Sequence, residues 1–271
     1  MPELPEVETV VRGLRRPLVG RVFTGATVRW PRAIAHPNAQ EFPRQVAGRR
    51  IVAVGRRGKY IVLTLNRGRL LIHLKMSGRL RVVPAGEPLD AHTHTILDLD
   101  DGRQLRFHDV RKFGRVYLVD DETQVTGHLG PEPLADDFTL ERFRARLARR
   151  SGRLKSLLLN QQFLAGLGNI YADESLFAAR LHPLRRADTL SLTEQQNLYD
   201  AIRSTLTAAV AEHGTTLDDG GYTDAQGRAG RYQRRLAVYG RRGQPCFLCG
   251  TPIERTIVGG RSTHFCPRCQ R

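Results

Sequence analysis

Hydrophobic residues near the start of the chain recur at helical spacing, and the spacing then changes to that of strands. The first pattern consists of Val7, Val10, Val11, Leu14 and Leu18. It predicts one amphipathic helix over residues 5–19. Between residues 22 and 119 the apolar positions form short β-branched runs with turn residues between them. Regular short strands of this kind predict an antiparallel sandwich or barrel.

The individual elements can be read from these runs. The predicted strands are Arg50–Val54, Tyr60–Leu65, Arg69–Leu74, Thr95–Leu99, Arg103–Phe107 and Arg115–Val119, and the predicted hairpin turns are Asn66-Arg67-Gly68 and Asp101-Gly102. Gly130-Pro131-Glu132-Pro133 predicts a hinge, after which the spacing is helical again. The predicted helices are Leu140–Ala148, Leu154–Leu159, Asn169–Ala179 and Thr193–Glu212.

Two local features refine the second half of the chain. Thr193 followed by Gln196 predicts a capping box at the start of the last of these helices. Residues 214–231 are rich in Gly and Asp and predict a long flexible loop.

The charge of the chain points to a polyanionic partner. The 271 residues have a formal net charge of +16, which favours nucleic acid or an anionic membrane as the partner. Arginine pairs are spread along the sequence between apolar stretches, which indicates a folded surface that grips phosphates at many points. No apolar run reaches the roughly 18 residues of a membrane-spanning helix, and the N-terminus lacks the apolar core of a secretory signal. We therefore expect no membrane association and a cytoplasmic location.

Four cysteines lie in the last 26 residues. They are Cys246, Cys249, Cys266 and Cys269, arranged as two CxxC pairs. Two such pairs can wrap one tetrahedral Zn²⁺ ion from two knuckles, whereas disulfides are disfavoured in a reducing cytosol. Because four thiolates leave no coordination position open, the sequence predicts one structural zinc ion and no other cofactor.

The N-terminus offers a nucleophile. Once Met1 is removed, Pro2 has a free secondary amine, whose ordinary pKa near 8 leaves roughly a tenth of it neutral at pH 7. Attack of this amine on a sugar carbon would give a cationic iminium that acts as an electron sink. Glu3 and Glu6 are acid and base candidates close by. The alternative is an ordinary helix start, where proline and acidic residues are common.

Several motifs share the order and spacing of one known family. They are Met1-Pro2-Glu3-Leu4-Pro5-Glu6-Val7-Glu8-Thr9, Arg57-Gly58-Lys59-Tyr60, His73-Leu74-Lys75-Met76-Ser77-Gly78, Asp109-Val110-Arg111-Lys112-Phe113-Gly114, His128-Leu129-Gly130-Pro131-Glu132-Pro133-Leu134, Gly166-Leu167-Gly168-Asn169-Ile170-Tyr171-Ala172-Asp173-Glu174 and Val238-Tyr239-Gly240-Arg241. With the four cysteines they run nearly end to end. The chain resembles the bacterial formamidopyrimidine-DNA glycosylases.

The resemblance implies an α+β protein with two lobes and with damaged double-stranded DNA in the cleft. Residues 1–130 would form a catalytic β-sandwich domain that begins with the catalytic helix. Residues 131–235 would form a helix-two-turn-helix DNA-binding domain with a lesion-capping loop at about 215–231, and residues 236–271 a zinc ribbon. The family extrudes a damaged base from the stack, removes it and cuts the strand on both sides of the sugar. A nucleoid-associated monomer is expected, since one active site per chain needs no partner subunit.

Catalytic roles follow from the same resemblance. Pro2 would attack C1′ of the damaged nucleotide, Glu3 would protonate the sugar ring oxygen, and Glu6 would position this site. Lys59 would donate a proton in β-elimination and contact phosphate, although a lone lysine at a strand end is more often only solvated. Arg261 matches the arginine assigned to δ-elimination. Because the pKa of arginine is above 12, we expect its main work to be holding phosphates, the alternative being a solvated hairpin tip.

Further residues are implied to contact DNA. Met76, Arg111 and Phe113 would fill the space that the extruded base leaves, with Met and Phe as apolar wedges and Arg paired to the widowed base. The glycines before Asn169 would let backbone amides approach a phosphate at a helix start. The remaining implied contacts are His73, His92, Arg150, Lys155, Tyr171 and Tyr239. His73 lies on an apolar strand and could equally be a satisfied core histidine.

One loop departs from the family pattern. Relatives usually have an aromatic residue directly after the position of Asp219, whereas Gly220-Gly221 reads here as an insertion that delays the aromatic to Tyr222. Lesion preference is therefore the least constrained expectation. The favoured substrates are oxidised purines, namely 8-oxoguanine and formamidopyrimidines. The alternatives are an endonuclease VIII-like enzyme for oxidised pyrimidines and a zinc-ribbon DNA-binding protein without catalysis.

Overall fold

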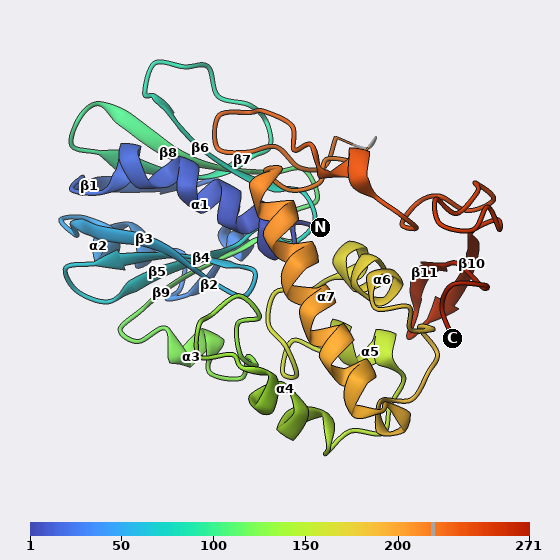
Figure 1. The fold of residues 1–271 in the computed structure, drawn as a ribbon. Coiled ribbons are helices and arrows are strands. Elements are labelled where there is room, and N and C mark those ends of the chain that lie inside the picture. Colours follow the sequence, from blue (N-terminus) through green and yellow to red (C-terminus); the bar gives the residue numbers. More distant parts are fainter. Residues whose placement is uncertain (218–219) are drawn as a thin grey trace. The chain divides into compact units, whose positions relative to one another are not determined.

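The computed structural model describes residues 1–217 and 220–271, whose fold is drawn in Figure 1. The chain divides into two compact units, each made of two stretches of sequence. The first unit contains Met1–His128 and Glu212–Arg231, and the second contains Leu129–Ala211 and Tyr232–Arg271. Within the described residues, no helix has the length and apolar character needed to cross a lipid bilayer.

The first unit is built on two β-sheets. One has the strand order β1-β7-β8-β6 and the other β2-β9-β5-β4-β3. The strands are β1 (Phe23–Val28), β2 (Ile34–His36), β3 (Ile51–Arg57), β4 (Tyr60–Leu65), β5 (Arg69–His73), β6 (Gly78–Pro84), β7 (Thr93–Leu99), β8 (Arg103–Asp109) and β9 (Arg115–Val119). Neighbouring strands are antiparallel except at the edge, where β2 pairs with β9 in parallel. The predicted antiparallel sandwich is confirmed.

A single core joins both sheets to the first helix, α1 (Leu4–Leu18). Val7 and Leu14 of this helix pack in one apolar cluster with Leu70 of β5 and Leu105 of β8. Figure 1 shows α1 running alongside both sheets. Its core residues extend from Val7 to Leu18, so apolar contacts fix most of its length. Short elements complete this part: η1 (Pro31–Ala33), α2 (Phe42–Val46) and α3 (Thr123–Thr126).

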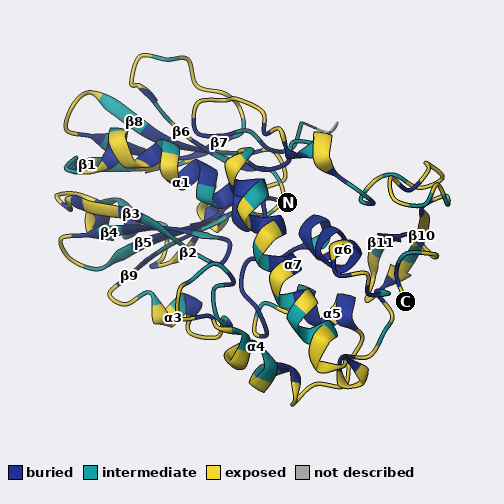
Figure 2. Ribbon diagram, viewed as in Figure 1, coloured by how far each residue is buried: buried dark blue, intermediate teal, exposed yellow. Residues whose placement is uncertain are grey.

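The second unit is helical and ends in a β-hairpin. Its elements are α4 (Leu140–Leu147), α5 (Leu154–Leu159), α6 (Asn169–Ala178), η2 (Ala187–Thr189), α7 (Leu192–Ala211), η3 (Tyr232–Arg235), β10 (Glu254–Val258) and β11 (Arg261–Phe265). Every residue from Ile170 to Phe177 is buried, and most of α6 is accordingly dark blue in Figure 2. This helix therefore forms the centre of its unit.

The start of α7 differs from the prediction. The helix begins at Leu192, and the capping box is made by Ser191 and Glu194. The Glu194 carboxylate accepts a hydrogen bond from the Ser191 amide at 2.8 Å, and Ser191 Oγ accepts one from the Glu194 amide at 3.3 Å. The predicted box of Thr193 and Gln196 is wrong, because the helix has already begun at Leu192. The side chain of Leu192 is exposed and so does not belong to the buried face of the helix.

The segment Glu212–Arg231 belongs to the first unit, whereas the sequence prediction grouped all of it with the helical domain 131–235. Its described part contains no helix or strand, in line with the predicted loop. It is nevertheless tied down, because Tyr222 and Ala225 are buried in the same core as α1. Contacts to residues more than 200 positions earlier in the chain therefore decide where this loop lies. Asp218 and Asp219, on which part of the expectation about this loop rests, lie outside the described residues.

Candidate active site and nucleic-acid interface

The N-terminal turn of α1 is buried and fixed by one carboxylate. Pro2 is buried, and Glu3 and Glu6 are each only 2% exposed. The Glu3 amide donates a hydrogen bond to Glu6 Oε2 at 2.8 Å, and the Thr215 amide donates one to Glu6 Oε1 at 2.7 Å. Glu6 therefore joins the turn that carries Pro2 and Glu3 to the segment Glu212–Arg231.

This junction requires a glycine. Gly214 has φ +79°, and a Cβ atom added to it would lie 2.6 Å from Glu6 Oε1. The backbone conformation and the lack of space both disfavour a side chain at this position. Gly230 packs against Gly214, where an added Cβ atom would lie 2.2 Å from the Gly214 carbonyl oxygen. The absence of a side chain at Gly230 therefore lets the segment fold back on itself.

Tyr222 anchors the same segment from the other side. Its side chain is 6% exposed, and its hydroxyl donates a hydrogen bond to the His213 carbonyl at 3.1 Å. Burial, and after it the nearby charge of Glu6, raise the pKa of Tyr222 far above its ordinary value. The aromatic residue that the sequence placed in the lesion-capping loop is thus a core residue of the first unit.

Lys59 and His73 form a second buried group in this unit. Lys59 is 6% exposed and lies in the turn between β3 and β4. His73 is 8% exposed, and its Nδ1 accepts a hydrogen bond from the Lys75 amide at 2.9 Å. Burial, together with the smaller effect of the charges of Lys75 and Lys59, lowers the pKa of His73 to about 3. His73 is therefore a neutral core histidine that supports the backbone of the next loop.

Two loops present large side chains to solvent, and one buried aspartate holds both. Met76 is 37% exposed and Phe113 is 47% exposed. Asp109 is 1% exposed and accepts hydrogen bonds from the Ser77 hydroxyl, from the Arg111 amide at 3.2 Å and from the Gly114 amide at 2.7 Å. Since Ser77 follows Met76 and the two amides flank Phe113, this one carboxylate sets the positions of both loops.

Asp109 and Ser77 are functional candidates that the sequence reasoning missed. Both stand inside motifs that carried the resemblance, and that was the available signal. A second bond at the base of the loop joins the Asp109 amide to the His92 carbonyl at 2.9 Å. The half-buried His92 ring lies 5.7 Å from the His108 ring.

In the second unit, the start of α6 is connected to the hairpin. Gly168 is the N-cap, and the Asn169 side-chain amide donates a hydrogen bond to the Ser262 carbonyl at 2.9 Å. Asn169 Oδ1 is buried and accepts no hydrogen bond within the described chain. The next hairpin residue towards the tip is Arg261, which is exposed and follows Gly259 and Gly260, both in left-handed conformation.

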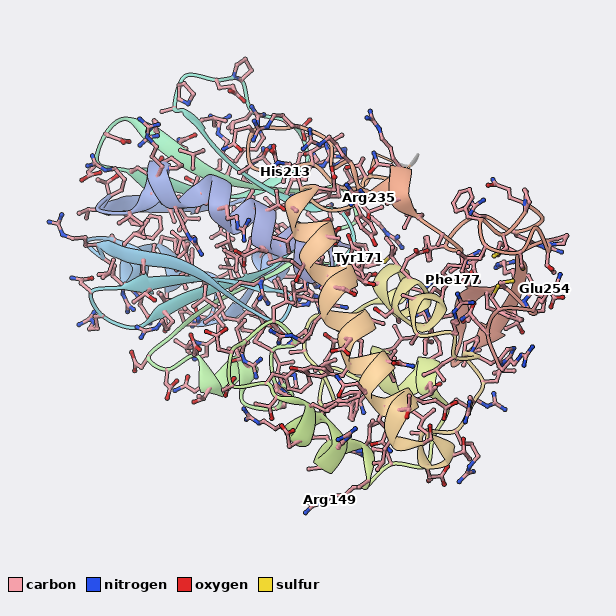
Figure 3. All side chains as sticks on the ribbon, in the orientation of Figure 1. Arg149, Tyr171, Phe177, His213, Arg235 and Glu254 are labelled. Atoms are coloured by element: carbon pink, nitrogen blue, oxygen red, sulfur yellow. The ribbon has the colours of Figure 1, made fainter. Side chains whose placement is uncertain are left out.

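Two predicted DNA contacts in this unit have no exposed surface. Lys155 is 0% exposed, and its Nζ lies 2.6 Å from Asp173 Oδ1 and 2.8 Å from the Asn169 carbonyl oxygen. Tyr171, labelled in Figure 3, is also 0% exposed and packs against the Tyr232 ring at 5.7 Å. The structure does not support direct phosphate contacts by these side chains. Lys155 is neutralised inside the protein by Asp173. Both side chains are buried beneath the start of α6.

The two acidic residues of α6 hold the C-terminal region. Asp173 Oδ2 accepts a hydrogen bond from the His264 amide at 2.9 Å. Glu174 accepts three, from the amides of Ala237, Val238 and Tyr239 at 2.8, 3.0 and 2.8 Å. Burial raises the pKa of Glu174, opposed by these hydrogen bonds. α6 therefore fixes both the hairpin and the turn that contains the half-buried Tyr239, while Arg150 lies exposed at the end of α4.

The four cysteine sulfurs converge on one point. Their Sγ atoms all lie within 4.8 Å of one another, with Cys246 and Cys269 3.9 Å apart and Cys249 and Cys266 3.5 Å apart. In a tetrahedron with Zn–S bonds of 2.3 Å the sulfurs are about 3.8 Å apart. The donor set therefore fits a structural zinc ion, as the sequence predicted.

Comparison with known proteins agrees with this geometry. Three family models match the chain: the formamidopyrimidine-DNA glycosylase N-terminal domain over residues 1–116, the H2TH domain of the same glycosylase over residues 129–219, and the zinc finger found in FPG and IleRS over residues 243–271. The formamidopyrimidine-DNA glycosylase of Herpetosiphon aurantiacus is 50% identical over 100% of both chains.

Solved structures give the same result. The MutM (FPG) protein of Thermus thermophilus has a TM-score of 0.90 and 44% identity, with 99% of this chain and 98% of that chain covered. The Lactococcus lactis Fpg in complex with DNA containing an abasic site has a TM-score of 0.91 and 35% identity, with 99% of each chain covered. The chain belongs to the formamidopyrimidine-DNA glycosylase family.

Proposed function

We propose that this chain removes oxidised purines from duplex DNA and then cuts the strand, with the nitrogen of Pro2 as the nucleophile. The chain is a DNA glycosylase of base excision repair with abasic-site lyase activity. The observation that carries the Pro2 assignment is the buried turn in which Glu6 fixes Glu3, next to Pro2, to the segment Glu212–Arg231. Damaged double-stranded DNA is the partner.

The chemistry begins with loss of Met1, because the nitrogen of Pro2 is otherwise part of an amide. The free amine attacks C1′, the bond between C1′ and the damaged base breaks, and the base leaves with a proton. Glu3 donates a proton to the sugar ring oxygen as the ring opens, which leaves an iminium ion on C1′. Removal of a C2′ proton then expels the 3′ phosphate, and a second elimination expels the 5′ phosphate.

Lys59 and Arg261 act on the phosphates beside the lesion. Lys59 is the proton donor in the first elimination and also contacts phosphate. Arg261, at the exposed tip of the hairpin, holds a phosphate by charge and leaves proton transfer to other groups. The zinc ion has only a structural role, since four thiolates fill its coordination sphere.

Met76, Arg111 and Phe113 replace the extruded base in the stack. Their support is the exposure of Met76 and Phe113 on two loops held by one buried carboxylate. His92 contacts phosphate next to this site, and His73 positions the Met76 loop from within the core.

In the second unit, Asn169 and the amides at the start of α6 bind a phosphate, with Arg150 and Tyr239 as further contacts. Lys155 and Tyr171 act as positioning residues behind this site. We assign catalysis to residues 1–130, DNA binding to 131–235 and the zinc ribbon to 236–271, with the segment Glu212–Arg231 packed in the first unit. The enzyme acts as a monomer on the DNA of the bacterial nucleoid.

Borohydride trapping tests the proposal. The processed protein should form a covalent complex with duplex DNA that contains an abasic site, and Pro2→Gly should lose most of it. Intact mass measures how much Met1 remains, and the fraction that retains Met1 should not trap. Failure of the processed wild-type protein to trap would remove the lyase mechanism. Duplexes with 8-oxoguanine or an oxidised pyrimidine test the substrate class, and faster excision of the pyrimidine would favour an endonuclease VIII-like enzyme.

A further inference from the structure

The only tryptophan of the chain lies at the base of the loop that carries Arg111 and Phe113. Trp30 follows β1, its amide donates a hydrogen bond to the His94 carbonyl at 3.4 Å, and the two rings are 6.5 Å apart. His94 Nε2 lies 2.9 Å from the carbonyl oxygen of Asp109, the last residue of β8, directly before that loop. His94 therefore connects the backbone of Trp30 to the start of this loop.

A direct contact reaches further into the loop. The Nζ atom of Lys112 lies 4.5 Å from the centroid of the Trp30 ring, within the range of a cation–π interaction. Lys112 has φ +59°, which is unusual for a residue with a side chain, so surrounding contacts must hold it there. Within the described part of the chain, no carboxylate pairs with Lys112. The indole ring is its partner.

The environment of the indole nitrogen of Trp30 also indicates that the ring serves to hold Lys112. Its Nε1 is buried and has no hydrogen-bond acceptor among the described residues. A buried indole N–H usually finds an acceptor, because leaving it without one is unfavourable. What Trp30 supplies at this position is therefore the face of its ring, and tryptophan has the best face for a cation.

We propose that Trp30 is a positioning residue for base extrusion, which acts by holding Lys112 on its ring face. With Lys112 held against the ring, Arg111 and Phe113 on either side are presented together, and the Arg111 guanidinium lies 5.0 Å from the Phe113 ring. Trp30 touches neither DNA nor the reacting atoms in this role. The inference rests on the proposed function of Arg111 and Phe113 as wedges.

The test compares Lys112→Met and Trp30→Leu with the control Arg32→Met. Arg32 also lies over the Trp30 ring, at 5.9 Å, but it belongs to η1 and not to the loop. We expect Lys112→Met and Trp30→Leu to slow excision of 8-oxoguanine from duplex DNA about five- to tenfold more than they slow trapping on single-stranded abasic DNA, where no base is extruded. Trp30→Phe should recover part of the loss, and Arg32→Met should change the ratio less than twofold.

Trp30 is also its own reporter, since its fluorescence is the only tryptophan signal. In the free protein, Lys112→Met should change the emission spectrum of Trp30. In the wild type, the emission should change when the protein binds duplex DNA that contains a tetrahydrofuran abasic analogue. A wild-type excision ratio in both Lys112→Met and Trp30→Leu would overturn the inference, as would an equal loss in Arg32→Met. Failure of the wild type to trap abasic DNA would instead remove the proposed function, and the free-protein emission would still test the contact.

Discussion

The ammonium of Lys155 lies 2.6 Å from the carboxylate of Asp173, and neither side chain has any exposed surface. Taking two charges out of water is costly, and their attraction compensates for this cost only while both partners are present. The pair also fixes the start of α6, because Lys155 donates a second hydrogen bond to the Asn169 carbonyl.

Lys155→Met should therefore destabilise the protein by about 3–5 kcal/mol, since it leaves the Asp173 carboxylate buried without its counterion. Urea unfolding measures the change. Arg186→Met is the matched control, because Arg186 pairs with Asp188 at 2.7 Å on the exposed surface. There we expect a change below about 1 kcal/mol. Equal effects of the two substitutions would mean that the buried pair does not stabilise α6.

Gly214→Ala should disrupt the junction between Glu6 and the segment Glu212–Arg231. Gly214 and Gly48 have nearly equal φ angles of +79° and +78°, but a Cβ atom on Gly48 would meet nothing within 4 Å. Gly48→Ala therefore reports only the backbone cost, roughly 1 kcal/mol. We expect Gly214→Ala to cost at least about 2 kcal/mol more and to lower the rate of borohydride trapping more than tenfold. Similar trapping rates in the two variants would contradict a role for this contact in catalysis.

The stability of the protein should depend on pH through His73. Its pKa in the folded protein is about 3, whereas a histidine in an unfolded chain titrates near 6.5. Between these values the unfolded state binds a proton that the folded state does not, so stability is complete above pH 6.5 and is lost as the pH falls. The loss is about 1.4 kcal/mol per pH unit. Between pH 7.5 and 5.0, the wild type should lose about 2 kcal/mol more than His73→Gln in urea unfolding, and parallel losses would contradict this role.

Removal of zinc should weaken DNA binding through the hairpin that carries Arg261. Without metal, the cysteine knuckles that support β10 and β11 lose their crosslink, so we expect a large rise in the Kd for lesion-containing duplex DNA. Arg261→Ala leaves the metal site intact and should reduce the slope of log K against log salt by about 1, as loss of one phosphate contact does. An unchanged slope in this variant would mean that Arg261 contacts no phosphate.

Elements with a regular apolar pattern and clear turn residues were predicted well. β4, β9 and α5 have the predicted bounds, Tyr60–Leu65, Arg115–Val119 and Leu154–Leu159. β1 and β6 were not predicted. Gly25 interrupts the apolar run of β1, and pairing with β7 outweighs the local sequence there. In β6, Arg79 and Arg81 alternate with apolar residues, which is the pattern of a half-buried strand, so its local sequence did contain the signal.

The parts of the site that depend on distant contacts could not be predicted. A lysine without an obvious partner is expected at the surface, and the burial of Lys155 depends on Asp173, which is 18 residues away. Likewise, nothing in the sequence around Tyr222 indicates that its ring packs in the core of the first unit. The motifs located these residues, whereas their burial depends on contacts between distant segments that only the packed structure shows.

The hydrogen bond between Glu6 and Thr215 joins residues 209 positions apart, and this has a consequence for how the enzyme matures. The ribosome makes the N-terminus first, at about 5–20 residues per second, so the segment that holds the turn follows roughly 10–40 s later. During that interval Met1 lies at the end of a chain whose final burial has not yet formed. Removal of the initiator residue can thus precede formation of the contact between Glu6 and Thr215, and the order of synthesis would leave Pro2 accessible when the proposed mechanism needs its amine to be released.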